Sequence, residues 1–188
     1  MGPTLFIYVP AAPDPDQLDA LLQREAIDVT RQAATTWSFW LAPSTCQVSV
    51  AIVPFGTESD GRGGSTESLL EPLDQKAYLE APGFLPVASI QIDNYCTRDP
   101  VGHSLLGRFA ARLARMFSGI IDLGGALLPA SVVSSRPGAL SSAVLSNGGT
   151  VHLVAPEVLE ACVSCEDFYL ETYTLSLHDA LPIRKSVV

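Results

Sequence analysis

The pattern of hydrophobic and polar residues is most regular between residues 99 and 123. Apolar side chains recur there every three or four positions, as on the buried face of a helix: Leu105, Phe109, Leu113, Met116 and Ile120, with Leu106, Ala110 and Phe117 beside them. Asp99 and Pro100 suit the N-cap and the first helical position, and Gly119 suits a left-handed C-cap. The pattern therefore predicts a long helix that turns into a short strand at residues 120–123.

Short apolar runs and turn residues fill the rest of the chain. Alternating or β-branched runs predict strands at residues 5–9, 36–41, 47–53, 87–92 and 150–154, of which the second and third pair as a hairpin. Amphipathic segments predict helices from Asp14 or Asp16 to about residue 26, at residues 72–80 and at residues 156–162. Residues 56–68 are rich in Gly and Ser and predict a flexible loop, and residues 129–142 predict a loop with room for one short strand.

Strands and helices thus interleave along the chain, which favours an α+β fold, an α/β sandwich. We expect a mixed, largely antiparallel sheet packed on the long central helix, in a single domain of residues 1–170. Residues 171–188 are excluded from this domain, because residues 174–183 resemble the in-frame translation of a common short-read sequencing adapter. Residues 174–188 are predicted to pack against nothing, and the pair His178 and Asp179 receives no functional weight.

Composition and net charge exclude several classes of protein. A chain of 188 residues with 47% hydrophobic residues can bury the core of one globular domain. Its net charge of −9 argues against a general nucleic-acid binder and suits a basic partner. No apolar run approaches a membrane span, and the start of the chain lacks the basic segment and long apolar core of a signal peptide. We therefore expect a cytoplasmic protein without a membrane partner.

Cys162 and Cys165 have the C-x-x-C spacing of redox and zinc sites. Redox pairs of this kind lie at a helix N-terminus, whereas these two residues fall at a predicted helix C-terminus. Zinc needs two more ligands, and the candidates Cys46, Cys96 and His152 form no second close pair. The sequence therefore predicts neither a metal site nor a cofactor.

Asp122, His103 and Cys96 remain as candidates for catalysis. Asp122 lies in a short apolar strand, where a carboxylate needs hydrogen-bond donors. It either accepts backbone N–H groups of Gly124 and Gly125 or belongs to a site with the other two residues. His103 lies in the first turns of the long helix and Asp122 just beyond its end, so the length of the helix keeps them from forming a dyad directly. No motif of a known hydrolase, metalloprotease or paired-carboxylate site is present.

A series of positions between residues 83 and 127 matches the pattern of a known family. That pattern is a GF-x-P turn, a strand, a link with Cys and Asn, an HxxLG helix start, an LA-rich helix and GG-x-ID-x-GG. The matching residues are Gly83, Phe84, Pro86, Cys96, His103, Leu106, Gly107, Leu113, Ala114, Phe117, Gly119, Ile121, Asp122, Gly124 and Gly125. The chain thus resembles the mainly actinobacterial Domain of Unknown Function 6368. Ser118 stands where this family usually has its first glycine.

The resemblance implies a bacterial cytosolic protein of unknown activity and supplies no catalytic residue. We expect a binding protein, of which an immunity protein that neutralises a basic bacterial toxin is the leading example, because the chain is acidic and lacks a catalytic constellation. The alternative is a small enzyme with a site near Asp122 and His103.

Overall fold

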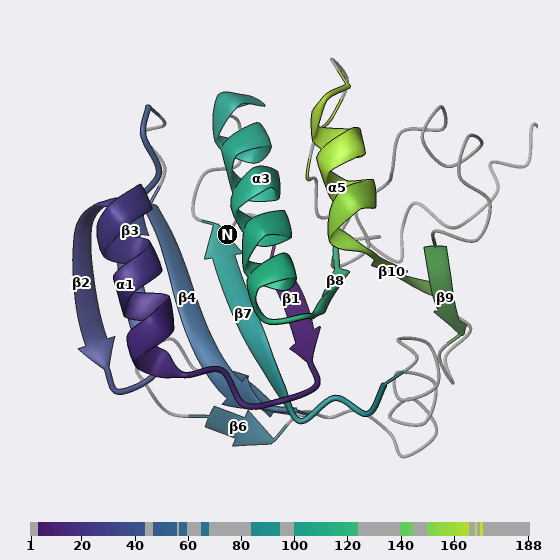
Figure 1. Ribbon diagram of the computed structural model, residues 1–188, viewed down its shortest axis with the longest axis horizontal. Helices are drawn as coiled ribbons and strands as arrows, with labels where there is room; N and C mark the ends of the chain where they lie inside the picture. Colours follow the sequence, from purple (N-terminus) through teal and green to yellow (C-terminus); the bar gives the residue numbers. More distant parts are fainter. Residues whose placement is uncertain are drawn as a thin grey trace, which may run out of the picture.

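The structure is a computed structural model that describes residues 4–43, 47–55, 57–59, 65–67, 84–94, 100–123, 140–144, 150–165, 168 and 170. Its strands are β1 (Thr4–Val9), β2 (Ile27–Ala33), β3 (Thr36–Trp40), β4 (Gln47–Pro54), β5 (Thr57–Ser59), β6 (Ser65–Glu67), β7 (Ala88–Asn94), β8 (Ile120–Asp122), β9 (Leu140–Val144) and β10 (Thr150–Val154). Eight of them form one sheet in the order β2-β3-β4-β7-β1-β8-β10-β9, and β5 pairs with β6 (Figure 1). Every described pairing is antiparallel.

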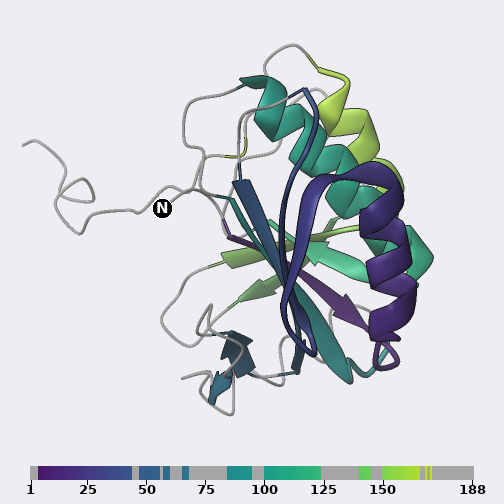
Figure 2. The ribbon, with the colours of Figure 1, turned by 90° about the vertical axis from the view of Figure 1, so that its left-hand side faces the viewer.

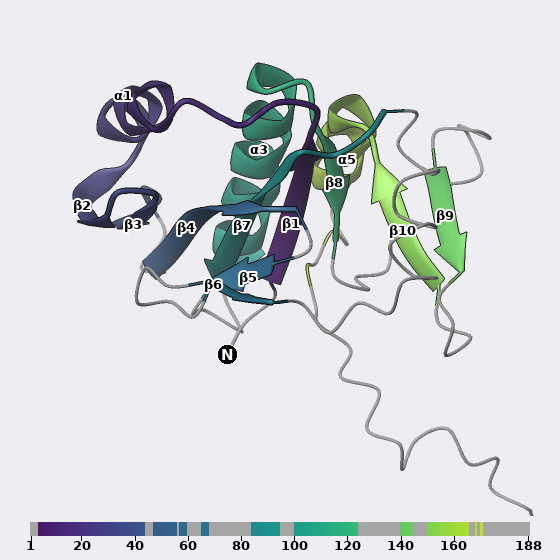
Figure 3. The same ribbon diagram turned by 90° about the horizontal axis from the view of Figure 1, so that it is seen from below.

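Three described helices cover one face of the eight-stranded sheet: α1 (Pro15–Glu25), α3 (Pro100–Met116) and α5 (Pro156–Val163). Figure 2 shows the sheet from its edge with these helices together on one side, and Figure 3 shows the same layering from below. In Figure 1, α3 runs between α1 and α5. The predicted α+β class is confirmed. No helix in the described part of the chain is long and apolar enough to cross a membrane.

The N-terminal helix forms where the sequence predicts it. Asp14 is the N-cap of α1, and its carboxylate accepts a hydrogen bond of 2.9 Å from the backbone N–H of Asp16. Leu18, Leu21 and Leu22 lie on one face of α1 and are buried against the sheet. The capping residue and the apolar period thus act together to place α1 over β2 and β3.

The core lies between the helices and the sheet. In β1 the side chains of Leu5, Ile7 and Val9 point to the helical layer and are fully buried, as alternation along a strand requires. They meet Leu113 and Ala114 of α3 in one hydrophobic cluster. The other side of β1 carries Phe6 and Tyr8, which pack in a second cluster with Phe55, Ile120 and Leu153.

The end of α3 corrects one detail of the sequence analysis. The helix ends at Met116, and Ser118 takes the left-handed conformation, with φ of 53°. Gly119 is required for close packing instead: an added Cβ would lie 2.7 Å from Cγ2 of Ile7 and 2.8 Å from the backbone oxygen of Tyr8. Met116, expected in the core, is 42% exposed, because the buried stripe of α3 is centred on Leu106, Ala110 and Leu113.

The remaining elements predicted from the sequence can be compared with those of the structure. The predicted hairpin exists as β3 and β4, and β7, β8, β10 and α5 lie within a few residues of their predicted bounds. β2 was not predicted, and the stretch expected as a flexible loop contains the short strands β5 and β6. The predicted helix at residues 72–80 and the tail of residues 171–188 lie outside the described residues.

Candidate functional site

Asp122 lies on the sheet face opposite the helices. Its neighbour Ile121 pairs with Ile7 and points into the helical core, so Asp122, which pairs with Phe6, points the other way. The carboxylate is 4% exposed, and the Tyr8 hydroxyl donates a hydrogen bond of 3.2 Å to its Oδ2. The predicted need for a hydrogen-bond donor is therefore met in part by a tyrosine of β1, whereas Gly124 and Gly125 lie outside the described residues.

His103 lies in the other layer. It belongs to the first turns of α3, is 1% exposed, and its Nδ1 accepts a hydrogen bond of 3.2 Å from the backbone N–H of Leu170. Acceptance at Nδ1 makes the neutral ring carry its proton on Nε2. The sheet separates His103 from Asp122, so the structure does not bring these two candidates into one site. Cys96 lies outside the described residues.

The two cysteines of the C-x-x-C sequence lie at the C-terminal end of α5, with Cys162 in its last turn and Cys165 two residues beyond Val163. Cys162 is buried in the core and Cys165 is half-buried, and neither of these two cysteines is in a disulfide. The Cys165 thiol lies 3.6 Å from the backbone oxygen of Ala161, on the last turn of the helix. The position at a helix C-terminus is thus as predicted. Among the described residues, no three His, Cys, Asp or Glu side chains gather in a group that could hold a metal ion.

A row of polar side chains on the Asp122 face of the sheet escaped the sequence analysis. Ser38, Ser49 and Gln91 come from adjacent strands and are each at least nine-tenths buried. Asp93, next to them, accepts hydrogen bonds of 2.8 Å from the Thr4 hydroxyl and 2.9 Å from the Gln91 amide. The alternation of polar and apolar residues in β3, β4 and β7 is the signal that could have revealed this row.

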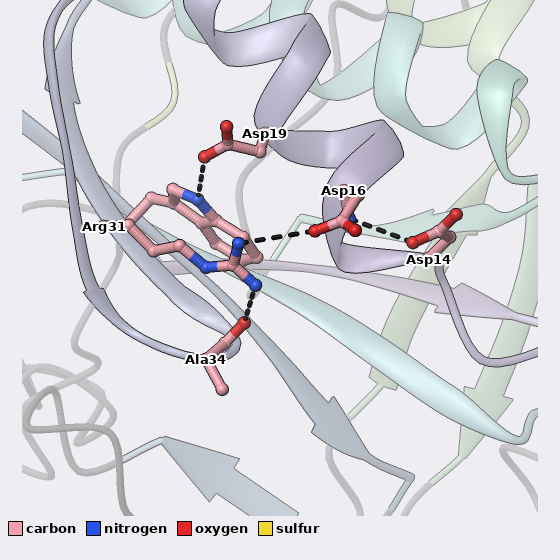
Figure 4. A network of polar contacts seen from close by, with 6 residues as sticks. Asp14, Asp16, Asp19, Arg31 and Ala34 are labelled. Atoms are coloured by element: carbon pink, nitrogen blue, oxygen red, sulfur yellow. Dashed lines mark hydrogen bonds and ion pairs between the residues drawn. The ribbon is translucent and has the colours of Figure 1, made fainter.

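A second polar network joins α1 to the β2–β3 hairpin (Figure 4). The indole N–H of Trp37, which is fully buried, donates a hydrogen bond of 2.8 Å to Asp19. The Arg31 guanidinium lies 5.2 Å from the Trp37 ring centroid, 3.4 Å from an Asp16 oxygen and 2.6 Å from the Ala34 oxygen. These contacts fix the edge of the sheet against the first turns of α1 and leave the carboxylates of Asp14 and Asp16 on the surface.

The outer face of α3 carries three arginines, two of which form ion pairs. Arg112 lies 2.6 Å from a Glu25 oxygen, and Arg115 forms a two-pronged pair of 2.7 and 2.8 Å with Glu160. Burial alone would raise the pKa of Glu25, but hydrogen bonds from Arg24 and Arg112 and their charges outweigh it and lower this pKa. Arg108 is the one arginine in the described part of the chain that forms no ion pair.

Two hollows adjoin along this face of α3. The first, of about 180 Å³, lies between α1 and α3 and is lined by Glu25, Leu41, Ala42, Leu105, Arg108, Phe109 and Arg112. The second, of about 300 Å³, is lined by Val101, Ser104, Leu105 and Arg108. Leu105 and Arg108 border both hollows, which we name together the α3 groove. The sequence analysis assigned Leu105 to the buried face of the helix and did not consider the arginines beside it, and so missed the α3 groove.

A comparison with known protein families finds a match that covers the whole described fold. The profile of a family of unknown function, DUF6368, matches residues 1–170. The chain belongs to the DUF6368 family. The resemblance drawn from residues 83–127 is therefore confirmed, and it extends over β1 to α5. Neither a curated protein nor a solved structure matches this DUF6368 chain. Its biochemical function is unknown, and the family supplies no site residue.

Proposed function

We propose that this DUF6368 protein is a cytoplasmic binding protein that recognises a basic protein, as an immunity protein recognises a bacterial toxin. The observation that carries the proposal is the distribution of charge. The chain has a net charge of −9, and four of the five arginines in its described part are already paired with its own carboxylates. Such a surface attracts a cationic protein over a range of several ångströms and repels an anionic one.

The first turns of α1 offer the place for this contact. Asp14 and Asp16 are exposed there, and Asp19 lies one turn further along the helix. Figure 4 shows Asp16 in contact with Arg31 of β2, Asp19 in contact with Trp37 of β3, and Asp14 bonded to the backbone of Asp16 at the start of the helix. A preorganised acidic surface loses little side-chain entropy on binding. These three residues, named here the α1 acidic patch, therefore suit lysines and arginines of a partner.

The test is co-expression with the products of the open reading frames that flank the gene, taken from several genomes. We expect one flanking product to stop growth when expressed alone and to be tolerated when this protein is present. The purified pair should then form a complex whose association rate constant falls as salt is raised from 50 to about 500 mM. A set of flanking products that neither inhibit growth nor bind would contradict the proposal.

A pair of charge-neutralising variants locates the contact. Asp16→Asn and Glu157→Gln each remove one exposed carboxylate from the first turn of a helix, in α1 and α5 respectively. We expect Asp16→Asn to slow association several-fold and Glu157→Gln to leave it nearly unchanged. Equal effects of the two variants would show that only net charge matters and would remove the α1 acidic patch from the proposal.

A further inference from the structure

We propose that the α3 groove is a second binding surface, which accepts an amphipathic helix of a protein partner that carries apolar side chains one turn apart and a carboxylate beside them. This inference goes beyond the proposed function, because it concerns a different surface and a partner segment that carries a negative charge instead of a positive one. It rests on the periodicity of the groove, on its exposed apolar floor and on Arg108.

The two hollows repeat with the period of the helix. Val101, Ser104, Leu105 and Arg108 of the second hollow correspond, four residues on, to Leu105, Arg108, Phe109 and Arg112 of the first. Four residues span about 6 Å along a helix. Side chains at positions i and i+4 of a partner helix have the same spacing. A helix that lies along α3 can therefore place one apolar side chain in each hollow.

Apolar side chains line the α3 groove together with Ser104, two arginines and Glu25, whose charge is paired with that of Arg112. Val101 is 52% exposed and Leu105 is partly exposed, and the buried side chains of Phe109 and Leu41 also line the first hollow. Exposed apolar side chains that adjoin in a concave surface are typical of protein interaction sites. The volumes, about 180 and 300 Å³, are large enough for an aliphatic or aromatic side chain in each hollow.

Arg108 indicates which charge the partner helix carries at the α3 groove. It borders both hollows, it is exposed, and it forms no ion pair within the described residues. Arg112, which borders the first hollow, is held by Glu25, so Arg108 is the guanidinium available to a ligand. A carboxylate flanked by apolar side chains complements this border, and a guanidinium can bind it in a two-pronged geometry. The net charge of −9 disfavours a long polyanion such as a nucleic acid at the same place.

The experiment is a selection from a phage-displayed library of 20-residue helical peptides against the immobilised full-length protein. We expect the enriched peptides to share apolar residues at i and i+4 and an Asp or Glu next to them. Affinities of the enriched peptides are then measured by fluorescence anisotropy for wild type, Arg108→Gln, Arg108→Glu and Arg115→Gln. Arg115→Gln is the matched control, because it removes one exposed guanidinium from α3 outside the α3 groove.

The expected result is a loss of about tenfold in affinity for Arg108→Gln, a larger loss for Arg108→Glu, and less than about twofold for Arg115→Gln. A peptide in which the selected Glu is changed to Lys should bind Arg108→Glu better than it binds wild type, an exchange that a purely structural role of Arg108 would not produce. Circular dichroism of each variant reports its folding.

Three results would overturn the inference. The first is a selection that enriches no peptide, and the second is enrichment of basic peptides or of peptides that bind Arg108→Glu as well as wild type. The third is binding of a 20-nucleotide DNA or of phosphatidylserine vesicles that depends on Arg108, since it would assign the α3 groove to another class of ligand. None of these results affects the α1 acidic patch, which is tested by Asp16→Asn.

Discussion

Ser118 and Gly119, at the turn between α3 and β8, are expected to respond to substitution in opposite directions. Ser118 has a φ of 53°, and a side chain in this left-handed region costs about 1–2 kcal/mol relative to glycine. Glycine also makes the unfolded chain more flexible, and this effect lowers the free energy of unfolding by about 0.4–1 kcal/mol. The midpoints of these two ranges differ by about 0.8 kcal/mol, so we expect Ser118→Gly to raise the free energy of unfolding by roughly 0.5–1 kcal/mol.

Gly119, in contrast, has no space for a larger side chain. A Cβ at this position would lie 2.7 Å from Cγ2 of Ile7, 2.8 Å from the Tyr8 oxygen and 2.9 Å from Cγ1 of Val9. These atoms belong to β1, which is paired on both sides, with β7 and with β8, and so cannot easily move away. We therefore expect Gly119→Ala to lower the free energy of unfolding by about 1–3 kcal/mol.

The assay is thermal unfolding followed by circular dichroism, with urea unfolding as a second measurement. For a chain of this size each kcal/mol shifts the midpoint by roughly 2–4 °C, so Ser118→Gly should raise it by about 1–4 °C and Gly119→Ala should lower it by about 2–12 °C. Ser118→Ala is the control, because it keeps a Cβ in the left-handed region and should give no gain. A lower midpoint for Ser118→Gly, or an unchanged one for Gly119→Ala, would refute this account of the turn.

Three further predictions concern α1 and the tail. Because the folded-state pKa of Glu25 lies below its ordinary value of 4.5, the stability from its charge is complete above that value and is lost as pH falls through the lower folded-state pKa. Urea unfolding should thus show Glu25→Gln less stable than wild type at pH 7, and the difference should shrink as the pH is lowered below 4.5. Asp19→Ala should lower the free energy of unfolding by about 1–2 kcal/mol, since it leaves the buried Trp37 indole N–H without its acceptor, and Asp19→Asn, which keeps an oxygen acceptor, should lower it less. Deletion of residues 174–188, measured by thermal unfolding, should leave the midpoint unchanged or slightly higher, and a drop of several degrees would mark this segment as part of the fold.

Elements with strong local signals could be predicted from the sequence. The Asp14 cap and the three leucines of α1 define that helix within the chain segment itself. β2 lacks such a signal: its sequence, IDVTRQA, is mostly polar and exposed, and its pairing with β3 shifts register twice. It is a strand because β3 offers it a paired edge. The cap at the end of α3 was assigned to Gly119 instead of Ser118, because local propensity favours glycine there and close packing against β1 is invisible in the sequence.

The candidate functional site, too, could be predicted from the sequence only in part. That Asp122 needs a hydrogen-bond donor follows from its apolar neighbours, but its partner Tyr8 lies 114 residues away and is fixed by the register between β1 and β8. The positions of His103 and Asp122 on different sides of the sheet follow from topology alone. The three arginines of α3 look alike in the sequence, and only the ion-pair partners from α1 and α5 distinguish Arg112 and Arg115 from Arg108.

The two proposed surfaces lie at opposite ends of α1, which allows one partner to use both. From Asp16 to Glu25, at the border of the α3 groove, the helix spans nine residues, or roughly 14 Å. Substitutions at sites that are well separated and share no partner usually have additive effects on free energy. If one partner contacts both surfaces, the effects of Asp16→Asn and Arg108→Gln on its affinity should therefore add in the double variant. If the surfaces serve different partners, each partner should respond to only one of the two substitutions, and the double variant should bind it no worse than that single variant.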